Sequence, residues 1–242
     1  MQFGDQTILR GISFSVARGE MLAVIGESGC GKTVLLKTLI GLNPYSAGRI
    51  LFDGIELNQL SSFELAQIRT RFGFVFQQAA LFDSMTVGEN IAFPLVQHTK
   101  KKKDEIQTII ETLIDEVGLD RSVLLKMPAE ISGGMRKRAG IARALALEPE
   151  LILYDEPTTG LDPVMSELIN ELMISVRRQH HVTGIMITHD MHSVLSVADR
   201  ALMLSPLAKL AAGEPQIRFD GSPAGLVHSP DARVRQFAGS RY

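Results

Sequence analysis

Residues 26–33 constrain this chain more than any other stretch. They read Gly-Glu-Ser-Gly-Cys-Gly-Lys-Thr and fit G-x-x-x-x-G-K-[ST], the pattern of a phosphate-binding loop. The apolar run 21–25 before the loop predicts a buried strand, and residues 34–40 after it predict a helix that Gly41 ends. Glycines let backbone N–H groups surround phosphate oxygens, and the start of a helix adds partial positive charge. The chain is therefore expected to bind a nucleotide.

Each position of this loop is a candidate nucleotide contact. Lys32 is placed to reach the β- and γ-phosphates, and the Thr33 hydroxyl to hold Mg²⁺. A helix start lowers the pKa of a thiol, so alkylation of Cys30 is expected to block nucleotide binding, and bound nucleotide to protect the thiol. The candidate contacts are Gly26, Glu27, Ser28, Gly29, Cys30, Gly31, Lys32 and Thr33.

Composition excludes several classes of protein. The 242 residues are 45% hydrophobic, which is enough for a full core. A net charge of −2 argues against a nucleic-acid partner, because such proteins usually carry a basic excess. A single cysteine excludes an internal disulfide and suits a reducing compartment. No apolar run of about 18 residues and no signal segment is found, so we expect a cytoplasmic protein whose membrane partner supplies any spans.

Apolar strands alternate with helical patterns along the chain. We expect strands at residues 8–16, 49–52, 72–76, 151–154 and 184–188, and helices at 104–117, 135–147 and 164–176. The continuous apolar runs suit parallel strands covered on both faces, so the fold class is α/β with a parallel sheet. From residue 205 the chain is expected to be irregular, with a short last helix near residues 232–237.

Polar residues follow three of the predicted strands. Asp155 and Glu156 end an apolar run, where ligands of parallel sheets bind. Asp155 suits a contact to Mg²⁺ through water, and Glu156 could polarise an attacking water. His189 after residue 188 could bond the γ-phosphate or orient the water, and Gln77 after Phe76 can reach Mg²⁺ or the water with its amide.

A second anion site is predicted at the turn Ser132–Gly133–Gly134, which we call the signature turn. It offers a hydroxyl, glycine amides and a helix start. The turn could act on the nucleotide of its own chain, or on one held by a second copy.

Together these motifs resemble the ATP-binding subunit of ABC transporters, over nearly the whole chain. The order matches: the loop at 26–33, Gln77, the signature turn, Asp155–Glu156, residues 159–162 and His189. The resemblance implies a single P-loop NTPase domain, residues 1–242, with a parallel-sheet core, a small antiparallel β subdomain, a helical subdomain at about 83–147 and an irregular C-terminal segment at about 205–242.

The resemblance also implies a mechanism. Two copies would sandwich two ATP molecules head to tail, with Mg²⁺ held by Thr33, Gln77 and Asp155. Ser132 and Gly134 would contact the γ-phosphate on the opposite copy, with Asp162 at the dimer seam. Glu156 would be the general base and His189 would bond the γ-phosphate. A groove near Gln77 would receive an integral-membrane permease subunit.

Two features narrow the resemblance to the ATPases of Mla-type systems, which move phospholipids with an MCE-class lipid-binding protein. One feature is the stretch of residues 82–95. The other is Met135, at a position where most relatives carry Gln. This implies phospholipid transport for outer-membrane lipid asymmetry, at the cytoplasmic face of the inner membrane. Alternatives are an importer of amino acids or another small solute, or a soluble ABC-type ATPase outside transport. The latter is disfavoured because the chain lacks sustained heptads and a second such domain.

The sequence departs from the family pattern at both ends. Most relatives carry a further stretch before the position of Phe3, the residue expected to stack on adenine. At the other end, residues 205–219 are longer than the usual hairpin of the family.

Overall fold

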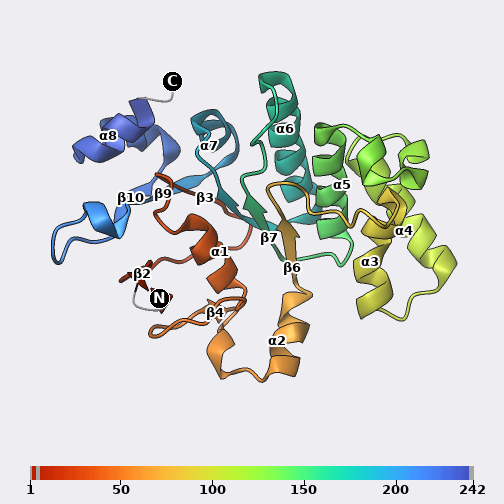
Figure 1. The fold of residues 1–242 in the computed structure, drawn as a ribbon, viewed down its shortest axis with the longest axis horizontal. Helices are drawn as coiled ribbons and strands as arrows, with labels where there is room; N and C mark the ends of the chain where they lie inside the picture. The colour runs from red at the N-terminus through yellow and green to blue at the C-terminus, as the bar shows by residue number, and fades with distance from the viewer. Residues whose placement is uncertain (1, 4–5, 240–242) are drawn as a thin grey trace. The chain divides into compact units, whose positions relative to one another are not determined.

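The structure is a computed structural model that describes residues 2–3 and 6–239, with side chains from Thr7 onward. The chain divides into two compact units, and their helices and strands are labelled in Figure 1. The first unit comprises Met1–Arg69 and Thr183–Tyr242, and the second comprises Thr70–Val182. The expectation that these two units form a single domain stays a prediction.

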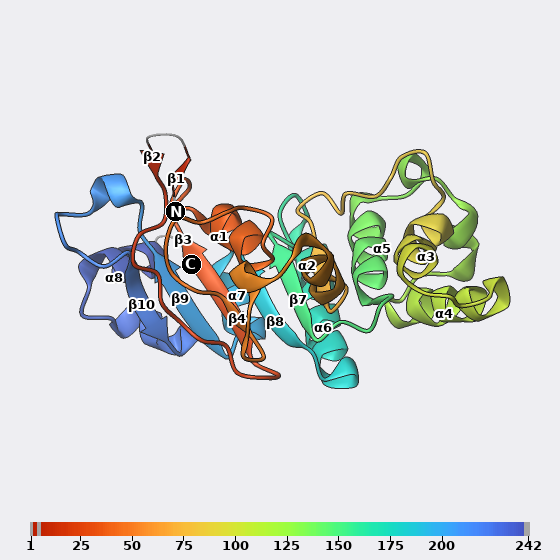
Figure 2. The ribbon, with the colours of Figure 1, turned by 90° about the horizontal axis from the view of Figure 1, so that it is seen from below.

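The first unit is built on a sheet with β3 (Met21–Gly26) at its centre. β8 (Thr183–Ile187) and β9 (Arg200–Leu204) pair with β3 in parallel, one on each side, and β10 (Ile217–Gly221) pairs with β9 antiparallel. These strands lie side by side in Figure 2. Every residue of β3 is buried, as its continuous apolar run predicted.

Helices and short hairpins complete the first unit. α1 (Lys32–Leu39) packs against β3 and β8, and α7 (Met191–Val197) packs against the 3₁₀ helix η5 (Pro223–His228), as does α8 (Ala232–Gly239). The remaining elements are β1 (Gln2–Phe3), β2 (Gln6–Thr7), β4 (Leu51–Phe52), β5 (Ile55–Glu56), η1 (Leu57–Gln59), α2 (Ser62–Arg69) and η4 (Leu207–Lys209).

The second unit contains two parallel strands and a group of helices. β6 (Phe72–Val75) pairs with β7 (Leu151–Asp155), and α5 (Gly133–Leu145) packs on β6. A Cβ on Gly73 of β6 would lie 2.8 Å from the Ala144 carbonyl oxygen of α5, so this glycine permits the close approach of helix and strand. The other elements are α3 (Val87–His98), α4 (Lys103–Glu116), η2 (Arg121–Leu125), η3 (Pro128–Glu130) and α6 (Pro163–His180).

Two sequence expectations were wrong. Residues 8–16 form no strand, because Gly11 takes a φ of 60° and the Arg10 N–H donates to a side chain, Gln216 Oε1, instead of to a strand. Residues 217–221 form β10, although the segment from 205 onward was expected to be irregular. The predicted α/β class with parallel strands is confirmed.

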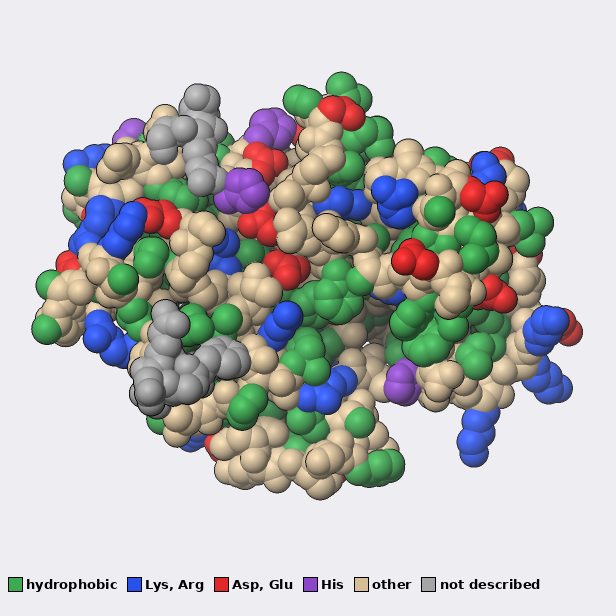
Figure 3. Space-filling model, viewed as in Figure 1, with side chains coloured by type: hydrophobic (Ala, Val, Ile, Leu, Met, Phe, Trp, Pro, Cys, Tyr) green, Lys and Arg blue, Asp and Glu red, His purple; other side chains and the backbone are tan. Residues whose placement is uncertain are grey.

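The surface shows mixed charge. On the face drawn in Figure 3, basic and acidic side chains are interspersed among the described residues. Among the helices that the structure describes, none combines the length and the apolar character that crossing a bilayer requires.

Candidate functional site

The phosphate loop has the backbone that its glycines predicted. Gly26, Gly29 and Gly31 adopt positive φ angles of 147°, 79° and 98°, which L side chains rarely adopt. A Cβ on Gly26 would also lie 2.3 Å from the Leu204 carbonyl oxygen of β9, so both strain and space require glycine there. Gly31 is the N-cap of α1 and provides no side-chain cap, and the partial positive charge of such a helix start favours an anion.

Lys32 lies across the phosphate loop. Its ammonium group donates to the carbonyl oxygens of Gly26 at 2.7 Å and Glu27 at 3.1 Å. A carbonyl is a weaker partner for an ammonium group than a phosphate oxygen is, so a phosphate that enters the loop can replace these acceptors. Thr33, the next residue, is exposed at the start of α1.

The Cys30 thiol differs from the sequence expectation. Only 1% of the residue is exposed, and burial raises the pKa of the thiol, although nearby Lys32 acts in the opposite direction. The expected lowering of this pKa by the helix start is therefore wrong. The thiol is buried in its neutral form, so reagents reach it only when the loop opens.

In the second unit, the predicted carboxylates end β7. Asp155 is buried, and Glu156 adopts a left-handed φ of 52°, an uncommon conformation for a residue other than glycine. One oxygen of Glu156, Oε2, accepts a hydrogen bond of 3.0 Å from the Thr159 hydroxyl. Gln77 is exposed in the turn after β6. The uncommon backbone conformation of Glu156, a candidate catalytic residue, fits the strain often found at active sites.

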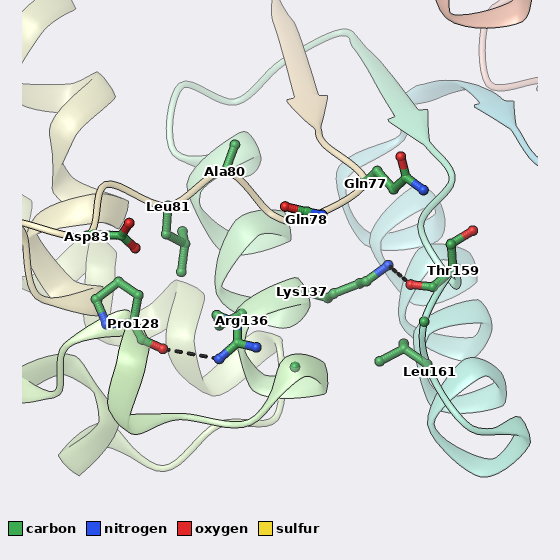
Figure 4. Close-up of a pocket in the computed structure, with 12 residues that line it drawn as sticks. Gln77, Gln78, Ala80, Leu81, Asp83, Pro128, Arg136, Lys137, Thr159 and Leu161 are labelled. Atoms are coloured by element: carbon green, nitrogen blue, oxygen red, sulfur yellow. Dashed lines mark hydrogen bonds between the residues drawn. The ribbon is translucent and has the colours of Figure 1, made fainter.

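Lys137 of α5 supports the Glu156 loop, and the sequence analysis missed it. Only 6% of Lys137 is exposed, and its ammonium group donates to the carbonyl oxygens of Pro157 at 2.6 Å, Thr159 at 2.8 Å and Glu156 at 3.3 Å. Figure 4 shows Lys137 extended toward Thr159. Burial lowers the pKa of Lys137 to about 8, and the negative charge of Glu156 opposes this. No sequence signal could reveal the residue, because its partners are backbone carbonyls.

The signature turn begins α5. Ser132 is the N-cap, and its hydroxyl accepts a hydrogen bond of 3.3 Å from the Met135 N–H. Gly134 is buried, and a Cβ there would lie 2.3 Å from Cε of Met165. Asp162 is the N-cap of α6 and accepts from the Met165 N–H at 3.0 Å. Ser132 and Asp162 thus lie exposed at helix starts, whereas Gly134 is buried.

At its other end, α5 holds the turn that follows Gln77. The Arg143 guanidinium donates to the carbonyl oxygens of Ala79 at 2.7 Å and Ala80 at 2.8 Å. Both alanines adopt left-handed φ angles, 61° and 47°. Burial lowers the pKa of Arg143 below its usual value. The arginine thus stabilises an otherwise unfavourable turn.

A cavity of about 590 Å³ opens between this turn, the start of α5 and residues 159–161 (Figure 4). Gln77, Gly133 and Lys137 are among the residues that line it. Three segments that the motif order singled out therefore border one hollow of the second unit.

The predicted site residues are divided between the units. The first unit holds the phosphate loop and His189, which is exposed just after β8, and the second holds Gln77, the signature turn, Asp155, Glu156 and Asp162. That these sets meet around one nucleotide stays a prediction. The side chain of Phe3, the expected adenine contact, lies outside the described residues.

The proposed Mg²⁺ ligands have suitable chemistry. Thr33, Gln77 and Asp155 offer hydroxyl, amide and carboxylate oxygens, the donors that Mg²⁺ prefers. Within the described part of the chain, no group of three His, Cys, Asp or Glu side chains forms a metal site made of protein alone. The chemistry of the three side chains fits a magnesium ion, and that they meet around one ion stays a prediction.

Comparison with known families and relatives agrees with this geometry. The family model described as ABC transporter matches residues 9–159. The "Probable ribonucleotide transport ATP-binding protein mkl" of Mycobacterium leprae is 41% identical over 99% of this chain, which spans 66% of that protein. The "Intermembrane phospholipid transport system ATP-binding protein MlaF" of Haemophilus influenzae is 39% identical over 97% of this chain and 85% of its own length.

Solved structures share the fold. A dimeric ATP-binding cassette in a post-hydrolysis state, bound to ADP and Pi, matches with a TM-score of 0.77 and 29% identity, covering 86% of this chain and 92% of that one. cbiO1 from Clostridium perfringens, part of the ABC transporter complex cbiONQ, matches with a TM-score of 0.82 and 29% identity over 94% of this chain and 87% of its own.

Proposed function

The chain belongs to the ABC transporter family, and we propose that it is the subunit that binds and hydrolyses ATP to power phospholipid transport. The observation that carries this proposal is the match to MlaF, which extends over 97% of this chain and 85% of that protein. The motifs needed for ATP chemistry all occur within the matched length.

Each site residue has a role in the proposed reaction. Lys32 and the N–H groups of the phosphate loop hold the triphosphate, and Glu156 takes a proton from the water that attacks the γ-phosphorus. His189 donates a hydrogen bond to the γ-phosphate. When bound, Mg²⁺ neutralises charge on the β- and γ-phosphates, and Thr33, Gln77 and Asp155 are the residues that would hold it.

The support for Glu156 as the base comes from its surroundings. The Thr159 hydroxyl donates to Glu156 Oε2 at 3.0 Å, and Lys137 holds the backbone of the same loop. These contacts fix the direction of the carboxylate, and a general base needs to lie within hydrogen-bond reach of its water.

We also propose that two copies act together. Ser132 and Gly134 of one copy contact the γ-phosphate held by the other, with Asp162 at the seam. The exposure of Ser132 and Asp162 at helix starts supports this, because both stay accessible to a second molecule. A permease docks near Gln77, an MCE-type protein supplies lipid binding, and the assembly acts at the cytoplasmic face of the inner membrane.

The substitution Glu156→Gln tests the ATPase assignment. The variant is expected to bind ATP with unchanged affinity, to lose turnover by a factor on the order of 10² to 10⁴, and to accumulate as a dimer when MgATP is added. Glu171→Gln serves as the matched control, because Glu171 is exposed on α6. Normal ATP hydrolysis by Glu156→Gln would remove Glu156 from the role of base.

The transported substrate needs a separate experiment. Purification of the tagged chain from membranes is expected to recover a permease, an MCE-type protein and bound phospholipid. Recovery of a small-solute permease without lipid would instead support the solute-importer alternative, which the name of the mycobacterial relatives also suggests.

A further inference from the structure

We infer that residues 205–219 hold the phosphate loop in its nucleotide-binding shape, with Gln216 as the positioning residue. The inference rests on the proposed function, since it concerns the same ATP site. It also assigns a role to the segment that is longer than the usual hairpin. The segment runs from the end of β9 into β10, along the blue loop that precedes β10 in Figure 1.

The Gln216 side chain joins three parts of the first unit. Its Nε2 group donates to the carbonyl oxygens of Cys30 at 3.1 Å and Ile8 at 3.0 Å, and its Oε1 accepts from the Arg10 N–H at 2.9 Å. Only 1% of Gln216 is exposed. A buried amide with both donor hydrogens and its oxygen bonded has one orientation, so it fixes the position of the Cys30 carbonyl.

The geometry links Gln216 to the part of the loop that binds phosphate. Cys30 precedes Gly31, the N-cap of α1, and Lys32, whose ammonium group reaches the loop. A Cβ on Gly31 would lie 2.8 Å from a methyl carbon of Leu9, so the segment that Gln216 holds also packs on the loop. Movement of the Cys30 carbonyl would therefore change the start of α1, whose N–H groups face the phosphates.

The segment is itself anchored. The Gln216 carbonyl accepts from the Ser205 N–H at 3.0 Å. The Glu214 carboxylate accepts from the Ala211 N–H at 2.9 Å and from Arg233 at 2.8 Å, and Arg233 chiefly lowers the pKa of Glu214, to about 2. The Lys209 ammonium forms an ion pair with Glu27 of the loop, but both side chains are exposed, so this pair contributes little.

The experiment uses Cys30 as the reporter, because it is the one cysteine of the chain, it is buried, and its carbonyl accepts from Gln216. Gln216→Met keeps the side-chain length and removes all three hydrogen bonds. In the full chain without nucleotide, we expect N-ethylmaleimide to label Cys30 of Gln216→Met roughly tenfold faster than Cys30 of the wild type. The Kd of the variant for MgATP is expected to rise by a similar factor. The kcat at saturating ATP is expected to change less than twofold, because Gln216 touches no reacting atom.

The matched control is Gln59→Met, since Gln59 is exposed in η1 and bonds only Glu56 among the contacts the structure describes. The Gln59→Met variant is expected to show the wild-type rate of Cys30 labelling and the wild-type Kd for MgATP. Labelling of Gln216→Met at low urea concentrations separates local opening from global unfolding. A Cys30 labelling rate that does not vary with urea indicates local release of the phosphate loop. A labelling rate that rises with urea as global unfolding does would overturn the inference.

Two further results decide the matter. Equal labelling rates and equal ATP affinity in Gln216→Met and wild type would overturn the inference, as would faster labelling with unchanged affinity. If Gln216→Met does not fold, Gln216→Asn replaces it, because the shorter amide cannot reach all three partners. Failure of the wild-type chain to bind MgATP would reject the proposed function, whereas the labelling comparison needs no nucleotide and still tests the contact.

Discussion

Replacement of Lys137 by Met is expected to weaken the fold and the ATPase together. Lys137 is the buried lysine of α5 that donates to three carbonyl oxygens in the loop carrying Glu156. Methionine has a similar length and helix propensity but no donor. The substitution therefore leaves three carbonyl oxygens without this partner and changes little else.

The size of the effect follows from two opposing terms. Three hydrogen bonds from a charged donor contribute roughly 1.5 kcal/mol each, or about 4 to 5 kcal/mol together. Burial of the ammonium group costs about 3 to 4 kcal/mol, because the pKa falls from 10.5 to about 8 and each pH unit corresponds to about 1.36 kcal/mol. The variant is thus expected to lose about 1 kcal/mol of unfolding free energy at pH 7, which lowers Tm by roughly 2 to 4 °C.

The same residue gives a pH signature. Between pH 8 and 10.5 the unfolded state keeps the Lys137 proton while the folded state releases it, so the unfolded state binds more protons. The contribution of Lys137 to stability therefore rises with pH across this window and is constant below pH 8. In Lys137→Met this rise is absent, so the difference between the two proteins should grow from pH 8 to pH 10.

The assay is urea unfolding of both proteins at pH 7, 8, 9 and 10, with ATP turnover measured at pH 7. Turnover is expected to fall more than ATP affinity, because Lys137 supports the Glu156 loop and not the phosphate loop. Lys101→Met is the matched control, since Lys101 is exposed and its replacement should change stability by less than about 0.5 kcal/mol. If the unfolding free energies of Lys137→Met and wild type differ by less than about 0.5 kcal/mol at each pH, the reasoning is refuted.

Four further outcomes are expected. Lys32→Ala should raise the Kd for MgATP roughly a hundredfold in calorimetry, and unchanged affinity would remove the phosphate-loop assignment. N-ethylmaleimide should label buried Cys30 slowly, and MgATP should slow it further; equal rates with and without MgATP would contradict the placement of Cys30. Tyr154→Phe should stabilise the chain by about 1 kcal/mol in urea unfolding, because the buried Tyr154 hydroxyl has no partner among the described residues; destabilisation would contradict this. Gly73→Ala should cost about 2 kcal/mol, since its Cβ meets the Ala144 carbonyl; a neutral result would show that α5 can shift.

Local patterns allowed much of the fold to be predicted. The apolar runs at β3, β7 and β8 mark strands that are buried on both faces, and such runs depend only on neighbouring residues. The helix predicted at 104–117 corresponds to α4, and its periodic apolar residues were recognisable for the same reason. Motif spacing likewise located the phosphate loop and the signature turn.

Contacts between distant residues could not be predicted. The Gln216 amide bonds the Cys30 carbonyl across 186 positions, and a carbonyl acceptor leaves no mark in the sequence. Lys137 escaped notice for a similar reason, since all its acceptors are backbone oxygens. The pKa of Cys30 was wrongly expected to fall, because the helix start was visible in the sequence whereas the burial of the thiol was not.

Helix α5 connects two segments of the candidate site, one at each of its ends. Its thirteen residues span about 20 Å at 1.5 Å per residue. Ser132 is the N-cap at its start, and Arg143, near its C-terminal end, donates hydrogen bonds to the turn that follows Gln77. Because Arg143 and Ser132 belong to the same helix, a rigid displacement of α5 would move the contact with the turn after Gln77 and the serine of the signature turn together.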